Sequence, residues 1–111
     1  MAKELEFVML LDCYGELLTE KQRNIMELYY CEDLSLGEIG VNLSITRQAV
    51  RSIIKRAEIL LADYEQKLGF VQRLKKMRRC FDDISSTAGK ITDENIKNTI
   101  ESRIKNALDL L

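Results

Sequence analysis

The sequence predicts an all-α fold of about six helices, and three observations support this. Proline is absent, and only five glycines occur in 111 residues. Leu, Ile, Glu, Lys and Arg, which favour helices, dominate the composition. Apolar side chains recur at spacings of three and four residues, without the alternation that is typical of strands. A chain of this length is expected to build one modest core rather than two independent ones.

The first helix is expected to begin near residue 5 and to stop near Gly15. Its predicted stripe consists of residues at helical spacing, most of them apolar, and includes Asp12. The apolar members of this stripe are Leu5, Val8, Met9 and Leu11.

The second and third helices both begin with a capping-box pattern. In this pattern a Ser or Thr is followed three residues later by Glu or Gln. It occurs at Thr19 with Gln22 and at Ser35 with Glu38, and the third helix is expected to end at about Asn42. The predicted buried stripe of the second helix consists of Ile25, Met26, Leu28 and Tyr29.

A long fourth helix is expected from the N-cap Thr46 to about Leu68, where Gly69 stops it. At 100° per residue its side chains separate into two groups, so one side packs on the core and the other projects outward. The apolar group is Ala49, Val50, Ile53, Ile54, Ala57, Leu60 and Leu61. The polar group is Arg47, Gln48, Arg51, Ser52, Lys55 and Arg56.

The C-terminal third predicts two further helices. The spacing of Phe70, Leu74, Met77, Phe81 and Ile84 is four-three-four-three, as in a short coiled-coil seam. This seam is either core within the chain or a dimer interface, and we favour the dimer because three N-terminal helices can bury only part of it. Residues 85–89 are expected to form a loop. Thr92 is expected to cap the last helix, whose stripe is Ile96, Ile100, Ile104, Ala107 or Leu108, and Leu111.

Charge is distributed unevenly along the chain, although the net charge is only -1. Residues 1–38 hold three basic and nine acidic side chains, whereas residues 47–79 hold ten basic and three acidic ones. Residues 80–111 carry a net charge of -2. Such asymmetry indicates a polyanionic partner, or an acidic protein surface, for the middle third. The alternative is a set of solvated helix faces that balance the acidic N-terminal third.

A short capped helix, a turn of about three residues and a helix with a basic outer side make up a helix-turn-helix pattern. We place the motif at about residues 35–57, inside a helix-turn-helix domain of residues 1–68, with residues 69–111 as a C-terminal extension. The first helix of such a motif holds the second against the core, so that the second can enter a major groove about 12 Å wide.

Each polar residue of the second motif helix then has an expected role on double-stranded DNA. Arg47, Gln48 and Arg51 lie near its start, where Arg can bind guanine and Gln can bind adenine through two hydrogen bonds. Side chains further along are expected to meet phosphate oxygens, and the helix N-terminus offers free N–H groups to another phosphate. These phosphate-directed positions are Thr46, Ser52, Lys55 and Arg56.

The central part of the chain resembles region 4 of bacterial sigma factors, which binds promoter DNA. The resemblance rests on the segments LTEKQR (18–23), LSLGEI (34–39) and TRQAV (46–50). A resemblance over nearly the whole chain is to the YlxM family of small bacterial helix-turn-helix proteins. It rests on LLDCYGELLTEKQ, LYYCEDLSLGEI, RQAV and IKRAEILLADYEQKLG. The family's genes typically lie beside the gene for the signal recognition particle GTPase, which implies a regulatory or accessory part in that pathway.

Three positions depart from these patterns. Ser44 stands where the turn of the motif often has glycine, so a left-handed backbone there would cost a little strain. Gly40 stands where alanine is usual, and it is expected to weaken its helix by about 1 kcal/mol. Arg51 and Ser52 stand where the family resemblance implies Tyr-Asp, which makes the outer side of this helix more basic.

A second basic segment, residues 67–79, has two possible uses. It could contact a phosphate backbone or RNA, or it could pair with acidic residues of the first third. The candidate contacts are Arg73, Lys75, Lys76, Arg78 and Arg79. These residues support a second hypothesis, in which the protein is an accessory module that does not bind DNA. It would instead bind the signal recognition particle GTPase, through an acidic surface, or its RNA.

Other protein classes find little support in the sequence. There is no histidine, no Gly-rich phosphate loop and no nucleophile beside a recognisable base, so we expect neither catalysis nor a cofactor nor a metal. No stretch reaches the roughly 20 apolar residues of a membrane span, so we expect a cytoplasmic protein with no membrane association. Cys13 and Cys31 are expected to be buried packing residues. Tyr29 and Tyr30 are expected to pack in the core rather than to stack on bases.

Overall fold

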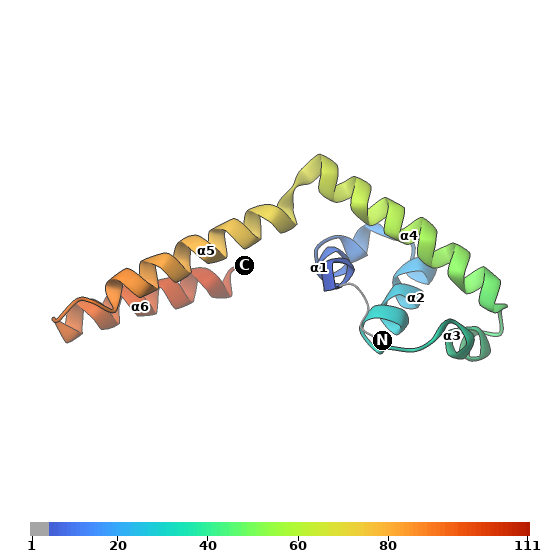
Figure 1. The fold of residues 1–111 in the computed structure, drawn as a ribbon, viewed down its shortest axis with the longest axis horizontal. Coiled ribbons are helices and arrows are strands. Elements are labelled where there is room, and N and C mark those ends of the chain that lie inside the picture. The colour runs from blue at the N-terminus through green and yellow to red at the C-terminus, as the bar shows by residue number, and fades with distance from the viewer. Residues whose placement is uncertain (1–4) are drawn as a thin grey trace. The chain divides into compact units, whose positions relative to one another are not determined.

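A computed structural model describes residues 5–111 of the chain, which form six α-helices, one short 3-10 helix and no strand (Figure 1). The prediction of an all-α fold is therefore confirmed. The α-helices are α1 (Leu5–Tyr14), α2 (Glu20–Tyr30), α3 (Leu36–Leu43), α4 (Arg47–Leu68), α5 (Phe70–Ala88) and α6 (Glu94–Asp109). The 3-10 helix η1 (Gly15–Leu17) follows α1 directly.

The chain divides into two compact units, an N-terminal unit that ends at Val71 and a C-terminal unit of residues Gln72–Leu111. The N-terminal unit holds the hydrophobic core. In this unit α4 packs against α1, α2 and α3 (Figure 1). Its fully buried large side chains come from three different helices, so α4 and its neighbours must fold together. They are Ile25, Met26, Ile39, Val50 and Leu61, each 0% exposed.

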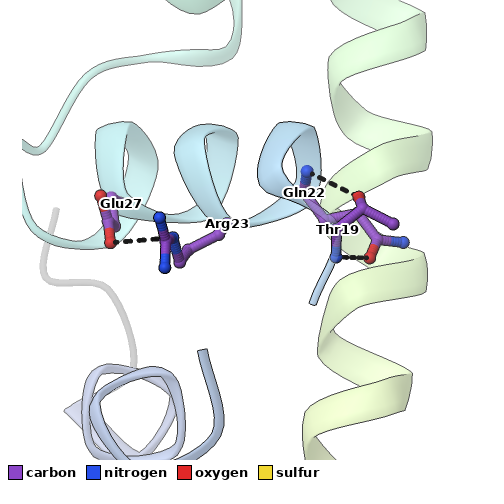
Figure 2. Close-up of polar contacts among 4 residues, drawn as sticks. All are labelled: Thr19, Gln22, Arg23 and Glu27. Atoms are coloured by element: carbon purple, nitrogen blue, oxygen red, sulfur yellow. Dashed lines mark hydrogen bonds and ion pairs between the residues drawn. The ribbon is translucent and has the colours of Figure 1, made fainter. Parts of the chain in front are cut away.

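The second helix begins as its capping-box pattern predicts. The Gln22 N–H donates to Thr19 Oγ1 at 3.2 Å, and the Thr19 N–H donates to Gln22 Oε1 at 3.1 Å (Figure 2). Two of the N–H groups that a helix start leaves unpaired are thus satisfied. One turn further on, Arg23 Nε lies 3.9 Å from Glu27 Oε1 on the exposed side of the same helix.

The predicted stripe of the first helix is right at Leu11, which is buried, and at Met9, which packs against the core, but it is wrong at Leu5. Leu5 is 72% exposed, whereas Leu10, Leu11 and Tyr14 are buried. The helix is apolar from Phe7 to Leu11, so spacing alone does not indicate which side faces α2 and α4. The packing of those helices decides it, and the contact falls on the side that carries Leu10 and Tyr14.

A side-chain clasp joins α1 to the start of α5 within the N-terminal unit. The Tyr14 hydroxyl donates to Glu65 Oε1 at 2.6 Å and accepts the Phe70 N–H at 3.1 Å. Glu65 Oε1 also accepts the Val71 N–H at 3.0 Å. Burial and the hydrogen bond to the Glu65 carboxylate both raise the pKa of Tyr14 above its ordinary value. Between α4 and α5, Gly69 adopts a left-handed backbone with φ 65°, as the helix-stop prediction requires.

In the C-terminal unit two expectations need correction. Residues 85–88 are helical rather than part of a loop, because α5 continues to Ala88. Ala88 is buried, and the absence of proline lets packing extend the helix. The N-cap of α6 is Asp93, not Thr92. Its carboxylate accepts the N–H groups of Asn95 and Ile96 at 3.0 and 3.2 Å.

The expected environment of the cysteines is also wrong, whereas that of the tyrosine pair is confirmed. Cys13, Cys31 and Cys80 are all exposed free thiols. Cys13 lies outside the buried side of α1, and Cys31 is the C-cap residue that follows α2. Tyr29 and Tyr30 pack against the core cluster, with ring centroids 5.0 Å apart in an edge-to-face arrangement. Tyr30 also donates a hydrogen bond to Glu58 of α4.

Candidate nucleic-acid interface

Helices α3 and α4 form a helix-turn-helix whose short turn is residues 44–46. Ser35 starts α3 with a complete capping box: its Oγ accepts the Glu38 N–H at 3.1 Å, and its N–H donates to Glu38 Oε1 at 3.0 Å. Ser44 ends the helix in a left-handed conformation with φ 58° and ψ 41°. The strain expected at this non-glycine position is therefore present.

The turn requires glycine at position 40. The sequence indicated only that this glycine weakens its helix, not that a side chain would clash there. A Cβ atom at this position would lie only 2.7 Å from the carbonyl oxygen of Ile45. The same turn is closed by the Ile45 N–H, which donates to Gly40 O at 3.0 Å. The absence of a side chain therefore permits the close approach of α3 to the turn, and the weaker helix propensity of glycine is the cost.

Thr46 sets the direction in which α4 begins. Its side-chain oxygen accepts the Ala49 N–H at 3.0 Å, as expected for an N-cap. The first turn of α4 contains no acidic residue, so the positive end of the helix dipole is not offset there.

The two sides of α4 separate as the residue pattern predicts. Val50, Ile54, Ala57 and Leu61 are buried in the core. Every polar residue of the other side is exposed, and none of its four cations forms a salt bridge within residues 5–111. From Arg47 to Lys55 this side extends over about 12 Å, at 1.5 Å per residue. The exposed polar residues are Arg47, Gln48, Arg51, Ser52, Lys55 and Arg56.

A second group of cations lies on α5. All five are exposed, and within the C-terminal unit they form no salt bridge. The group consists of Arg73, Lys75, Lys76, Arg78 and Arg79.

The predicted seam on α5 is only partly covered. Leu74 and Phe81 are half-buried, whereas Phe70, Met77 and Ile84 remain between 44% and 48% exposed. The exposed members of the stripe alternate with half-buried ones, so about half of its apolar surface is uncovered.

Sequence reasoning missed one polar position close to the turn of the motif. Lys21 and Asn24 of α2 line a surface cleft together with Leu43 and Ile45. Lys21 is exposed and forms no salt bridge among the residues that the structure describes. The only hint in the sequence is its place two residues after the N-cap Thr19, beside a helix start that itself favours anions.

Another cleft, of about 450 Å³, lies between α1 and α2 and shares Arg23 and Glu27 with the cleft beside the turn. Its walls carry the carboxylates of Asp12, Glu16, Glu27 and Glu32 beside apolar side chains. Within the described residues, no group of three or more His, Cys, Asp or Glu side chains could hold a metal ion. Nor does that part of the chain contain a helix that is long and apolar enough to cross a membrane.

Comparison with known proteins identifies similar chains. Residues 1–105 match the family model UPF0122, described as "Putative helix-turn-helix protein, YlxM / p13 like". A UPF0122 protein of Clostridium kluyveri is 42% identical over 111 residues, which is 94% of this chain and 100% of the relative. One of Clostridium perfringens is 40% identical over 98% of this chain and 99% of its own length. One of Desulforamulus reducens is 57% identical over 72 residues, or 64% and 62% of the two chains.

Proposed function

Since the chain belongs to the UPF0122 family of helix-turn-helix proteins, we propose that it is a DNA-binding regulatory protein that reads duplex DNA with the outer side of α4. The observation that carries this proposal is the separation of α4 into a buried apolar side and an exposed cationic side. The exposed cations have no carboxylate partner in the described chain. The phosphate groups of DNA would supply the negative charges with which these cations can pair.

The roles of the α4 residues follow from their distance along the helix. Arg47, Gln48 and Arg51 occupy the first two turns, from which side chains of a groove-bound helix reach base edges. Ser52 follows Arg51 directly, and Lys55 and Arg56 lie about one turn further on. These three side chains contact phosphates, together with the N–H groups at Thr46. Lys21 of α2 adds a phosphate contact beside the turn. The resemblance of the central segments to sigma factor region 4, which binds promoter DNA, supports this assignment of roles.

The protein acts as a homodimer in this proposal. Two copies would present their α4 helices to successive major grooves about 34 Å apart, so the site is expected to be a pseudo-palindrome. The open apolar stripe on α5 supports this expectation, because it needs a partner that the two-helix C-terminal unit does not supply.

The test begins with selection of a duplex from random DNA, followed by fluorescence anisotropy at several salt concentrations. Arg51→Ala and Gln48→Ala should each lose about 1–3 kcal/mol of discrimination between the selected duplex and a scrambled one. Lys55→Ala should weaken binding to all sequences alike and lower the salt slope by about one unit. Equal, salt-insensitive binding by the wild type and all three variants would contradict the proposal.

A second candidate function is that of an accessory protein that binds the signal recognition particle GTPase or its RNA. The exposed cations of α5 favour it, because they form a basic surface that α4 does not need for DNA. Genomic DNA and RNA co-purified from cells can separate the two functions. DNA lost with the Arg47→Ala/Arg51→Ala double variant supports the first. RNA or the GTPase lost only with Lys75→Ala/Arg79→Ala supports the second.

A further inference from the structure

We infer that the C-terminal unit is completed by the C-terminal unit of a second copy, which packs on it in the antiparallel direction to form a four-helix bundle. This deepens the dimer of the proposed function by naming the surface, the orientation and the residues that select it. The surface is the open side of the α5–α6 hairpin.

The hairpin leaves too much apolar surface uncovered to be complete by itself. Helices α5 and α6 are joined by only five residues, and α6 returns along α5 (Figure 1). Within residues 72–111 only Ala88 and Ile104 are buried apolar side chains. Met77, Ile84 and Ile96 are between 44% and 52% exposed.

These exposed side chains lie on one side of the hairpin. Met77 and Ile84 are seven residues apart, nearly two full turns, so they project in the same direction. Because α6 runs opposite to α5, an ideal helical count places Ile96 and Leu110 on the continuation of that side. Leu110 is 88% exposed. Two such sides packed together give the layered core of a four-helix bundle.

Charge along the hairpin identifies a second copy as the occupant and fixes its direction. Residues 72–79 carry five basic and no acidic side chains, and residues 102–111 carry two basic and one acidic. Residues 80–101, around the hairpin tip, carry five acidic and two basic side chains. Antiparallel packing sets the basic end of one copy against the acidic tip of the other, whereas parallel packing sets like charges together.

The spacing of the α5 side chains is self-complementary about residue 80. With a twofold axis there, Met77 of one copy lies opposite Ile84 of the second, and the reverse contact follows from symmetry. Lys76 of one copy, which flanks the apolar side, then lies within about 3 Å along the axis of the level of Asp83 of the second copy, and the reverse holds by symmetry. Neither forms a salt bridge within the described chain, and the two are too far apart on α5 to pair with each other. Such flanking pairs are what sets orientation in helical bundles.

The test measures the dimer dissociation constant of the full chain, without DNA, by analytical ultracentrifugation at low salt. Lys76→Glu and Asp83→Lys should each raise this constant about tenfold, because each turns two attractive pairs into two repulsive ones. The double variant Lys76→Glu/Asp83→Lys recreates both pairs with reversed sign, so its constant should return to within about threefold of the wild type.

The matched control is Lys75→Glu with Asp82→Lys, which makes the same charge changes on the opposite side of α5. These variants change the same overall charges but break no facing pair, so each should raise the constant by less than about threefold. A monomeric wild type overturns the inference, and so does a double variant that dimerises no better than the single ones. Because no DNA is present, failure here leaves DNA binding by α4 intact. A monomer that still binds a single half-site would show this directly.

Discussion

The N-terminal and C-terminal units have similar helix content but very different interiors. Five large side chains of the N-terminal unit are 0% exposed, whereas the C-terminal unit buries only Ala88 and Ile104. Four helices that cross one another can enclose a core, but two helices can only share a stripe. Periodicity gives both units their helices, but only the N-terminal unit has enough layers of helices to enclose a core.

The largest expected effect comes from a cavity in the N-terminal core. Leu61→Ala should lower the free energy of unfolding by about 3 kcal/mol, because Leu61 is fully buried between α4 and its neighbours. Chemical denaturation of the full chain measures this. Leu110→Ala, at a position of the C-terminal unit that is exposed in a single copy, is the comparison and should cost less than about 0.5 kcal/mol when the chain is diluted to the monomer. Similar losses for both variants would remove the contrast between the units.

The turn of the helix-turn-helix gives the next effect. Gly40→Ala should destabilise the N-terminal unit by about 2 kcal/mol, because the new methyl group meets the Ile45 carbonyl. Gly37→Ala, on the same helix and with open space around it, should instead stabilise by about 0.5 kcal/mol. Thermal unfolding followed by circular dichroism compares the two. A stabilising Gly40→Ala would mean that the turn is looser than described.

The Tyr14 clasp tests how α5 begins. Tyr14→Phe keeps the ring but removes the hydroxyl that serves Glu65 and Phe70, and it should cost about 1.5 kcal/mol at neutral pH. Tyr64→Phe, beside the same ring cluster, should cost less than 0.5 kcal/mol, a roughly neutral change.

The dependence of stability on pH provides a second test of the Tyr14 clasp. The pKa of Tyr14 is raised in the folded state, first by burial and then by Glu65, so the unfolded chain loses this proton at lower pH than the folded one. The stabilisation is therefore fully present below pH 10 and is lost as the pH rises through the folded pKa. Denaturation between pH 8 and 11 should show a smaller loss of stability for Tyr14→Phe than for the wild type. Parallel curves would contradict the clasp.

The smallest expected effect lies in the C-terminal unit. Asp93→Ala removes the cap of α6 and should destabilise that helix by about 1 kcal/mol, whereas Thr92→Ala should leave it unchanged. Amide hydrogen exchange resolves the two units, and faster exchange should be confined to α6. Faster exchange in α3 or α4 as well would show that the units unfold together.

The candidate interface was predictable from the sequence to a large extent. The capping boxes at Thr19 and Ser35 and the two-sided pattern of α4 depend on residues within one or two helical turns. Such local signals specify where a helix begins and which side is polar. The helical conformation of residues 85–88 and the N-cap at Asp93 were not predicted. Ser and Thr are common both in loops and at helix caps, so packing determines which of these structures they form.

Local signals along the chain are enough to specify the set of helices and the cationic side of α4, since each depends on neighbouring residues. Packing between helices sets the buried side of α1, the need for glycine at position 40, the Tyr14–Glu65 clasp and the exposure of Cys13 and Cys31, together with the left-handed backbone at Ser44. These depend on atoms that are far apart in sequence. The physical reason is that periodicity identifies an apolar side, whereas contact with another helix determines how much of it is buried.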